Sequence, residues 1–260
     1  MLFTVAALIS IYCAVVLLLF LGQRAMIYPA PKGPAAIPPG FTRVSLDTAD
    51  GLSLTGAWRA ASPGKPTIVF FHGNGDSLPG AAIATQRFAA AGYSVLLADY
   101  RGYAGNPGAP DEAGLFADGR AAIAFLQRHG IAPEQLVLMG ASLGTGVATR
   151  LAAEHAPAAL VLVSPFTSLP DAGAAALPLV PVRLLMHDRF DNLGAIPQVH
   201  APVLVLHATD DRIIPFAQGE ALAKATPDGK LVRFAGYGHQ LQFTTAAQDA
   251  VIDWLASLRR

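Results

Sequence analysis

A short apolar run at residues 135–139 leads into Gly140-Ala141-Ser142-Leu143-Gly144, and a helix-prone segment follows at residues 145–155. This order predicts a strand that turns sharply into a helix, with a serine at the turn. Glycines two residues to either side leave room for a strained backbone and for close packing of the helix on the strand. Such a turn exposes a serine hydroxyl as a nucleophile, although a helix N-cap alone also explains the serine.

Strand-like and helix-like runs alternate along the last 220 residues, a length typical of one domain. This alternation predicts an α/β fold with a mostly parallel, eight-stranded sheet covered by helices on both faces. The first two strands are expected to form a hairpin. Strands are predicted near residues 42–47, 52–58, 67–71, 93–98, 135–139, 158–163, 202–207 and 231–234. Helices are predicted near residues 80–91, 111–129, 142–155, 215–225 and 244–258.

Acidic and histidine residues follow two of the later predicted strands. Asp210 and Asp211 come shortly after the seventh strand, and His239 stands in a glycine-rich turn after the eighth. With Ser142, this makes the chain order serine, acid, histidine, which is the order used by α/β-hydrolases. The sequence therefore predicts that Ser142, one of the two aspartates and His239 form a catalytic triad.

Two backbone N–H groups are candidates for binding an oxyanion. The N–H of Leu143 lies at the start of the helix that follows Ser142. In a hydrolase of this design the second donor comes from the loop after the third strand, where Asn74 is the best candidate and Gly73 the next. We therefore expect Asn74 and Leu143 to form the oxyanion hole.

Other polar residues near the predicted site have structural interpretations. His72 precedes the serine in the wrong order for a base in this fold and is expected to shape its loop. Asp99, Tyr100 and Arg101 follow the fourth strand and are expected to brace loops through hydrogen bonds. Ser164, which follows the sixth strand, is interpreted as a turn residue.

Six short blocks between about residue 26 and the C terminus carry a family resemblance. They are Phe71-His72-Gly73-Asn74-Gly75, Asp99-Tyr100-Arg101-Gly102-Tyr103, Gly140-Ala141-Ser142-Leu143-Gly144, Ser164-Pro165-Phe166-Thr167-Ser168, Asp210-Asp211 and Gly238-His239. With them the sequence resembles the α/β-hydrolase superfamily, and within it the N-terminally membrane-anchored serine hydrolases that include protein depalmitoylases and lysophospholipid hydrolases.

The resemblance implies a role for each residue of the predicted triad. Ser142 would be the nucleophile, His239 the general base and Asp211 the acid that orients the histidine. Asp211 is preferred to Asp210 because members of the family usually place the acid four residues before a proline, here Pro215.

The N-terminal segment has the composition of a membrane span. Residues 2–22 contain no charge and no proline, and thirteen of them are Leu, Ile, Val or Phe. As a helix this segment is about 31 Å long, enough to cross the hydrocarbon core of a bilayer. A cleaved signal peptide is the alternative, but the apolar stretch is long for one and no basic segment precedes it. We expect residues 1–23 to form a retained transmembrane anchor.

The side of the membrane on which the domain lies is only weakly indicated. Arg24, Lys32 and Arg43 follow the span, and no acidic residue comes before Asp47. The positive-inside tendency therefore leans toward a cytoplasmic catalytic domain, although a large domain can be exported regardless. Cys13, the one cysteine, lies within the span and does not discriminate between compartments.

Two further segments have distinct compositions. Residues 24–41 form a proline-rich linker that either extends as a spacer or packs against the domain. The hydrolase domain is expected at residues 42–260. Within it, residues 166–199 are apolar and interrupted by prolines, as in a small lid-like insertion. Their apolar side chains suit an acyl-binding surface. The same side chains are explained equally well if this segment only covers the core of the domain.

These features together predict a membrane-anchored serine hydrolase. Its reaction would be cleavage of a carboxylic ester or thioester, of a small molecule or an acylated lipid, through an acyl-enzyme. No cofactor or metal motif is present, and the formal net charge of zero without a basic stripe argues against nucleic-acid binding. Two alternatives stay open, namely a serine aminopeptidase-like amidase and a catalytically silent tethered scaffold.

Overall fold

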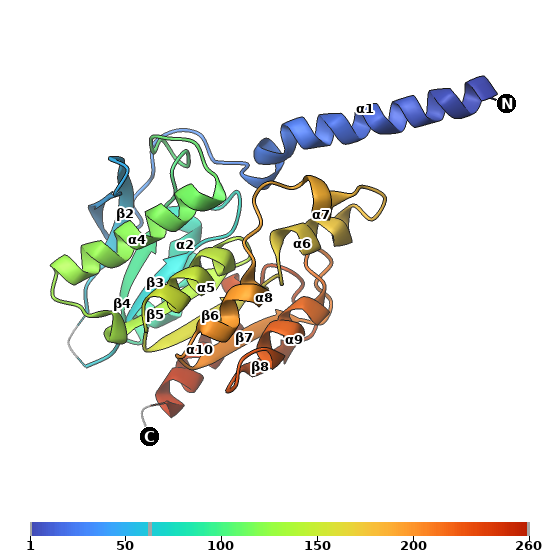
Figure 1. Ribbon diagram of the computed structural model, residues 1–260. Helices are drawn as coiled ribbons and strands as arrows, with labels where there is room; N and C mark the ends of the chain where they lie inside the picture. The colour runs from blue at the N-terminus through green and yellow to red at the C-terminus, as the bar shows by residue number, and fades with distance from the viewer. Residues whose placement is uncertain (1, 62–63, 259–260) are drawn as a thin grey trace.

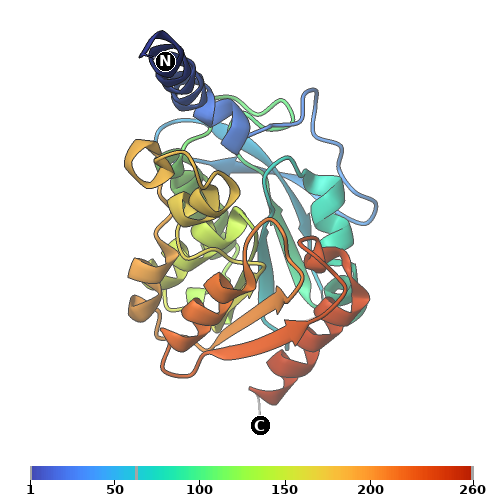
Figure 2. The same cartoon turned by 90° about the vertical axis from the view of Figure 1, so that its right-hand side faces the viewer.

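A computed structural model describes residues 2–61 and 64–258 of the chain. Met1 of the predicted anchor, and residues 62–63 and 259–260 of the predicted domain, lie outside the described residues. An apolar helix, α1 (Leu2–Ile27), projects from an α/β domain (Figure 1). This helix and the C terminus lie at opposite ends of the molecule (Figure 2).

The sheet has eight strands in the order β1-β2-β4-β3-β5-β6-β7-β8. The predicted hairpin is confirmed, because β1 pairs antiparallel with β2, and β2 pairs antiparallel with β4. All other neighbours are parallel, so the sheet is mixed but mostly parallel, as expected. The strands are β1 (Thr42–Asp47), β2 (Ser53–Arg59), β3 (Thr67–Phe71), β4 (Ser94–Ala98), β5 (Leu136–Ala141), β6 (Ala159–Val163), β7 (Val203–Ala208) and β8 (Lys230–Phe234).

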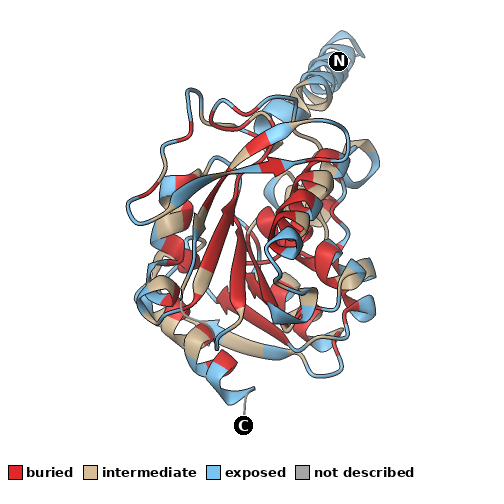
Figure 3. Ribbon diagram, turned by 90° about the vertical axis from the view of Figure 1, so that its left-hand side faces the viewer, coloured by how far each residue is buried: buried red, intermediate tan, exposed pale blue. Residues whose placement is uncertain are grey.

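The central strands are buried on both faces. Every residue of β3, β5, β6 and β7 is buried, whereas β1 and β8 at the edges are largely exposed or half-buried (Figure 3). Parallel strands that are covered on both faces have continuous apolar sequences, and this explains the apolar runs from which these strands were predicted.

Helices cover both faces of the sheet. Ile68 and Phe70 of β3 pack in the cluster that includes α2 (Leu78–Ala84), α3 (Gln86–Ala90) and α10 (Thr245–Ser257). Val69 and Phe71 point to the opposite face, toward α4 (Glu112–Arg128), α5 (Gly144–Glu154) and α9 (Phe216–Lys224). The sequence predicted one helix over residues 80–91, but it is split at Thr85. The Thr85 hydroxyl bonds back to the Ala81 carbonyl, and its backbone leaves helical geometry at φ −119°.

The predicted insertion at residues 166–199 lies between β6 and β7, next to α1 (Figure 1). We call this segment the cap. It contains three short helices, α6 (Leu169–Ala176), α7 (Val182–Leu185) and α8 (Asn192–Ala195), followed by one 3₁₀ turn, η2 (Ile196–Gln198).

The proline-rich segment packs against the domain, so it is not an extended spacer. The Ala104 N–H donates to the Pro31 carbonyl at 2.9 Å, and the Arg43 guanidinium donates to the Ala35 carbonyl at 2.9 Å. Tyr28 and Ala35 are buried. Because α1 continues to Ile27, the helix runs directly into this packed segment.

A buried ion pair fixes the loop after β4. The Arg101 backbone N–H donates to Asp118 Oδ2 at 2.9 Å, and its Nε donates to Asp118 Oδ1 at 2.8 Å. Its Nη1 also donates to Asp50 Oδ2 at 2.7 Å. Arg101 and Asp118 are both buried. The predicted bracing role of Arg101 agrees with these contacts.

A second buried pair lies behind the loop after β3. His72 Nε2 lies 3.2 Å from Asp99 Oδ1, and His72 Nδ1 lies 2.8 Å from the Gly73 carbonyl. A ring that carries a proton on each nitrogen can donate to both of these oxygens. Burial disfavours the charged imidazolium, but the hydrogen bond and charge of Asp99 outweigh it and raise the pKa of His72. The Tyr100 hydroxyl donates to the His72 carbonyl at 2.9 Å.

Removing the Asp118 carboxylate should destabilise the fold strongly. Asp118→Ala leaves the buried Arg101 without its main partner, and we expect a loss of about 3 kcal/mol in the free energy of unfolding. Asp249→Ala is the control, because Asp249 pairs with Arg87 in similar two-contact geometry on the exposed surface. Urea unfolding should show a much smaller loss for the control. Equal losses for the two variants would contradict a structural role for the buried pair.

The His72–Asp99 pair should make stability depend on pH. Because the folded-state pKa of His72 is raised, its contribution is complete below the ordinary histidine pKa of 6.5 and is lost as pH rises through the folded-state value. We expect the stability advantage of the wild type over His72→Gln to be largest at low pH and to shrink above this point. Unfolding free energies measured from pH 5.5 to 9 provide the check. A constant difference would mean that the pKa of His72 is the same in the folded and unfolded states, and an advantage that grows with pH would mean that the buried ring is neutral.

Candidate active site

Ser142 stands at the turn between β5 and α5 with a φ of +49°, a left-handed conformation that is strained for serine. Its backbone N–H donates to the Val163 carbonyl at 3.0 Å, which ties the turn to the end of β6. A Cβ on Gly140 would overlap the Gly144 carbonyl, and a Cβ on Gly144 would overlap the Phe71 carbonyl. The two glycines are therefore required where α5 approaches the sheet, as the sequence pattern indicated.

The structure brings together the three residues of the predicted triad. His239 Nε2 lies 3.0 Å from Ser142 Oγ, and His239 Nδ1 lies 2.8 Å from Asp211 Oδ2. With Nδ1–H donating to the carboxylate, Nε2 is the acceptor for the serine hydroxyl proton. This is the arrangement that a serine nucleophile and its general base require.

The Asp211 carboxylate is held by four donors. Its Oδ1 accepts from the Ile213 N–H at 2.9 Å and from the Ile214 N–H at 3.0 Å. Its Oδ2 accepts from His239, and His207 Nε2 lies 3.3 Å away. Burial alone would raise the pKa of Asp211, but hydrogen bonds from His207, His239 and Ile214 outweigh it and hold this pKa well below its usual range.

Asp210, the other aspartate of the pair, contacts the loop that carries His239. Its Oδ1 accepts from the Gly236 N–H at 2.9 Å and its Oδ2 from the Gly238 N–H at 3.2 Å. Asp210 is exposed and has no hydrogen bond to the His239 ring. The two neighbouring acids thus have different contacts. Asp210 holds the loop backbone, and Asp211 holds the imidazole.

Both predicted oxyanion donors lie in the cavity beside Ser142. Among the residues that the structure describes, neither the Leu143 N–H nor the Asn74 N–H donates a hydrogen bond to the protein. The loop of Asn74 approaches the nucleophile closely, since a Cβ on Gly73 would lie 3.4 Å from the Ser142 Cβ. Two unpaired donors beside a nucleophile are suited to stabilise an oxyanion.

Sequence reasoning missed two further polar residues at the site. The Ser164 hydroxyl donates to the His239 carbonyl at 3.1 Å, and Ser164 has a strained φ of +49°. His207 is fully buried, and its Nε2 also lies 3.0 Å from the Ile214 carbonyl. A serine directly after a buried strand, and a histidine four residues before the acid, were the available signals. Neither signal separates these roles from ordinary turn and core positions.

The cavity that contains Ser142 has a volume of about 350 Å³ and is mainly apolar. Its polar side chains are those of Asn74, Ser142 and His239. Much of the apolar wall comes from the cap and from the end of α1, with Phe166, Leu169, Ala172, Leu177, Met186, Met26 and Ile27. Within the described residues, no group of three or more His, Cys, Asp or Glu side chains is suited to hold a metal ion.

Two family models match the chain. The model described as "Serine aminopeptidase, S33" matches residues 62–192, and the model described as "TAP-like protein" matches residues 188–260. Together they cover the sheet from β3 onward, and with it Ser142, Asp211 and His239.

Individual relatives agree with these models. The chain is 39% identical over 245 residues to an uncharacterized protein of Mycobacterium tuberculosis, covering 90% of this chain and 86% of that protein. It is 32% identical over 198 residues to a lysophosphatidylserine lipase of Danio rerio, covering 68% of this chain but only 50% of the relative.

A solved structure shows the same fold. An esterase of Pyrococcus furiosus superposes with a TM-score of 0.72 at 18% identity, covering 90% of this chain and 99% of the esterase. Family models, relatives and fold therefore agree that the chain belongs to the α/β-hydrolase superfamily.

Proposed function

We propose that this hydrolase is a membrane-anchored serine enzyme that cleaves carboxylic esters or thioesters of acylated substrates through an acyl-enzyme. The observation that supports this most strongly is the continuous chain of contacts from Ser142 Oγ through the His239 ring to the Asp211 carboxylate, at 3.0 and 2.8 Å. The esterase fold and the lipase relative are consistent with it.

In the first half of the proposed reaction, Ser142 Oγ attacks the acyl carbon while His239 Nε2 takes the hydroxyl proton. The negative charge that develops on the carbonyl oxygen is bound by the N–H groups of Leu143 and Asn74. The bond to the leaving group then breaks, and His239 returns its proton to the departing oxygen or sulfur. Asp211 stabilises the transient imidazolium and keeps Nε2 directed at the serine.

In the second half, water replaces the leaving group. His239 removes a proton from this water, which attacks the acyl-enzyme carbon, and the same two N–H groups bind the oxyanion again. The bond to Ser142 Oγ then breaks, the serine regains its proton from His239, and the free carboxylic acid leaves.

The composition of the cavity favours an acyl ester or thioester over an aminopeptidase substrate. An aminopeptidase has to bind a free ammonium group near the scissile bond, which calls for a carboxylate in the pocket. None of the described residues that line the cavity is acidic, and most of its wall is apolar. Such a surface suits an acyl chain.

The N-terminal helix supports the membrane part of the proposal. In α1, a mean hydropathy of 2.7 extends over an 18-residue window, and no residue of that window is fully buried. Large apolar side chains such as Phe3, Leu8, Leu18 and Leu21 are exposed. A bilayer would cover them, and we propose residues 1–23 as the anchor of a hydrolase domain at residues 42–260, joined by the packed segment at residues 24–41.

Ser142 should be the residue that reacts with fluorophosphonate probes. We expect the wild type to be labelled and Ser142→Ala to lose labelling together with ester hydrolysis, because turnover without the nucleophile falls by about a millionfold. Ser53→Ala, an exposed serine on β2, is the control and should label like the wild type. Equal labelling of Ser142→Ala would remove this residue from its proposed role.

The two neighbouring aspartates should differ sharply in their effect on turnover. Asp211→Asn cannot hold the histidine in the productive tautomer, and we expect kcat to fall by about 10³ to 10⁴-fold. Asp210→Asn keeps one acceptor for the loop backbone and should cost less than about 10-fold. Both kcat values are measured on a short-chain ester, and a larger loss for Asp210→Asn would reverse the assignment of the acid.

A further inference from the structure

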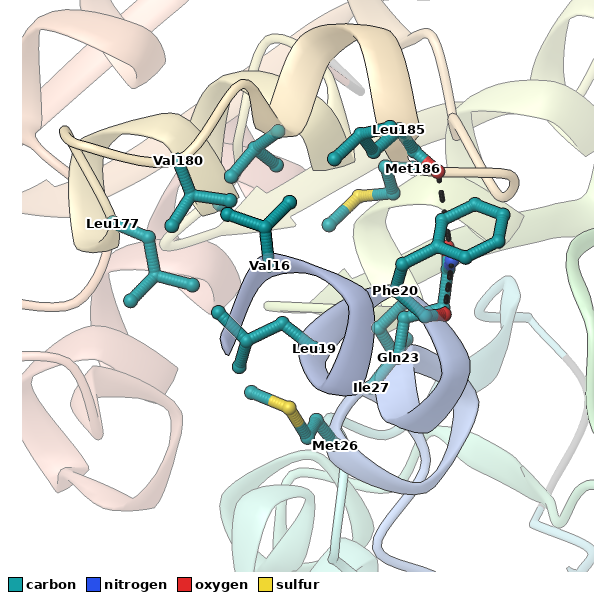
Figure 4. A pocket seen from close by; sticks show the side chains of 12 residues that line it. Val16, Leu19, Phe20, Gln23, Met26, Ile27, Leu177, Val180, Leu185 and Met186 are labelled. Atoms are coloured by element: carbon teal, nitrogen blue, oxygen red, sulfur yellow. Dashed lines mark hydrogen bonds between the residues drawn. The ribbon is translucent and has the colours of Figure 1, made fainter. Parts of the chain in front are cut away.

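The active-site cavity adjoins a second apolar pocket, which lies between α1 and the cap. Val16, Leu19 and Phe20 of α1 face Val180 and Leu185 of the cap across this pocket (Figure 4). The pocket is next to the cavity of Ser142, because five residues line both. These residues are Met26, Ile27, Gly173, Leu177 and Met186.

One face of α1 is turned toward the cap. Val16, Leu19, Phe20, Gln23 and Ile27 are half-buried, and their spacing of three and four residues places them on one side of the helix. The residues between them, such as those at positions 17, 18 and 21, are exposed. The N-terminal helix is therefore a wall of the pocket as well as a candidate membrane span.

Polar contacts hold the two walls together. The Tyr12 hydroxyl donates to the Leu179 carbonyl at 2.8 Å, and the His187 N–H donates to Gln23 Oε1 at 2.9 Å. The rings of Phe20 and His187 meet edge to face at 5.0 Å. The cap is thus attached to α1 at two levels along the helix.

The Tyr12 contact places the tip of the cap, residues 178–181, beside the apolar part of α1. Tyr12 precedes Gln23 by eleven residues, which corresponds to about 17 Å along a helix. At the level of Tyr12, Leu179 of the cap is 84% exposed. A bilayer that covers α1 from residue 2 to residue 22 would cover this leucine as well.

Part of the backbone at residues 178–181 leaves no hydrogen-bonding group unsatisfied. Pro178 and Pro181 have no N–H to satisfy, and the Leu179 carbonyl accepts from Tyr12. Arg183, the charged residue of α7, pairs with Asp171 at 2.7 Å, so its charge is compensated within the cap.

We propose that the long acyl chain of a substrate residing in the bilayer enters sideways between α1 and the cap and reaches Ser142 along this pocket. This inference rests on the proposed serine hydrolase function and names the route and the part of the substrate that the site recognises. An acyl chain that passes from hydrocarbon into an apolar pocket never crosses water, so its extraction carries no hydration cost. The membrane helix then contributes directly to substrate selection.

Obstructing the pocket should change chain-length preference. We expect Leu19→Trp to lower the ratio of kcat/KM for a palmitoyl ester to that for a butyryl ester at least 10-fold in the full-length protein in nanodiscs. Leu21→Trp is the matched control, since Leu21 lies on the opposite side of α1 and is 70% exposed. It should leave the ratio at the wild-type value. The same ratio in the two variants would overturn the lateral route.

The carrier of the chain is distinguished by comparing palmitoyl glycerol with an S-palmitoylated peptide. We expect Leu19→Trp to lose activity toward whichever of these two substrates the wild type hydrolyses. Labelling of Leu19→Trp by a short-chain fluorophosphonate at the wild-type rate shows that the fold and Ser142 are intact. The serine hydrolase proposal is tested separately. If it is wrong, Ser142→Ala retains activity, whatever the palmitoyl-to-butyryl ratio of Leu19→Trp.

The depth of the cap is tested without turnover. Leu179→Trp is placed in nanodiscs of phosphatidylcholine whose acyl chains carry bromine, which quenches tryptophan fluorescence at short range. We expect a larger quenched fraction than in the wild type, whose Trp58 and Trp254 lie in the α/β domain. A quenched fraction equal to that of the wild type would place the tip of the cap in water and overturn the proposal.

Discussion

The Asp211 carboxylate is the group on which the geometry of the site depends. Two backbone N–H groups and two histidines converge on it, so that its charge is compensated although it is buried. A carboxylate held in this way leaves the His239 ring one favourable orientation, with Nε2 toward Ser142. The Asp210 contacts to Gly236 and Gly238 restrict the same loop from its outer side.

Buried charges farther from the serine support the loops that build the pocket. The His72–Asp99 pair stands behind the loop that carries Asn74, and Arg101 joins the loop after β4 to α4 through Asp118. Breaking a buried pair leaves an uncompensated charge, so each pair restricts its loop to a narrow range of conformations. Rigid loops at the carboxyl ends of parallel strands are the usual platform for sites in this type of sheet.

The N-terminal helix links the proposed anchoring to the proposed chemistry. Its half-buried face contacts the cap, and its last turn contributes Met26 and Ile27 to the cavity of Ser142. A simple tether would be joined to its domain by a mobile spacer, but here residues 28–41 pack on the domain and Tyr28 donates to Asp188 of the cap at 2.8 Å. The orientation of the helix relative to the pocket is therefore part of the fold.

The apolar runs and the glycines at 140 and 144 were sufficient to predict the sheet and the serine turn. The chain order, together with the family resemblance, predicted the triad of Ser142, Asp211 and His239. The apolar runs and the glycines are local signals, because strand burial and a tight turn act on neighbouring residues. Contacts between distant segments were not predictable in this way. The Ser164 bond to the His239 carbonyl, the His207 contact with Asp211 and the seat of α1 against the cap depend on how strands β6 to β8 and the N-terminal helix lie in space. The sequence by itself determined the fold class and the residues of the candidate triad, whereas only the tertiary structure decided the surroundings of the triad and the walls of its pocket, since packing brings together residues that carry no local signal of their partners.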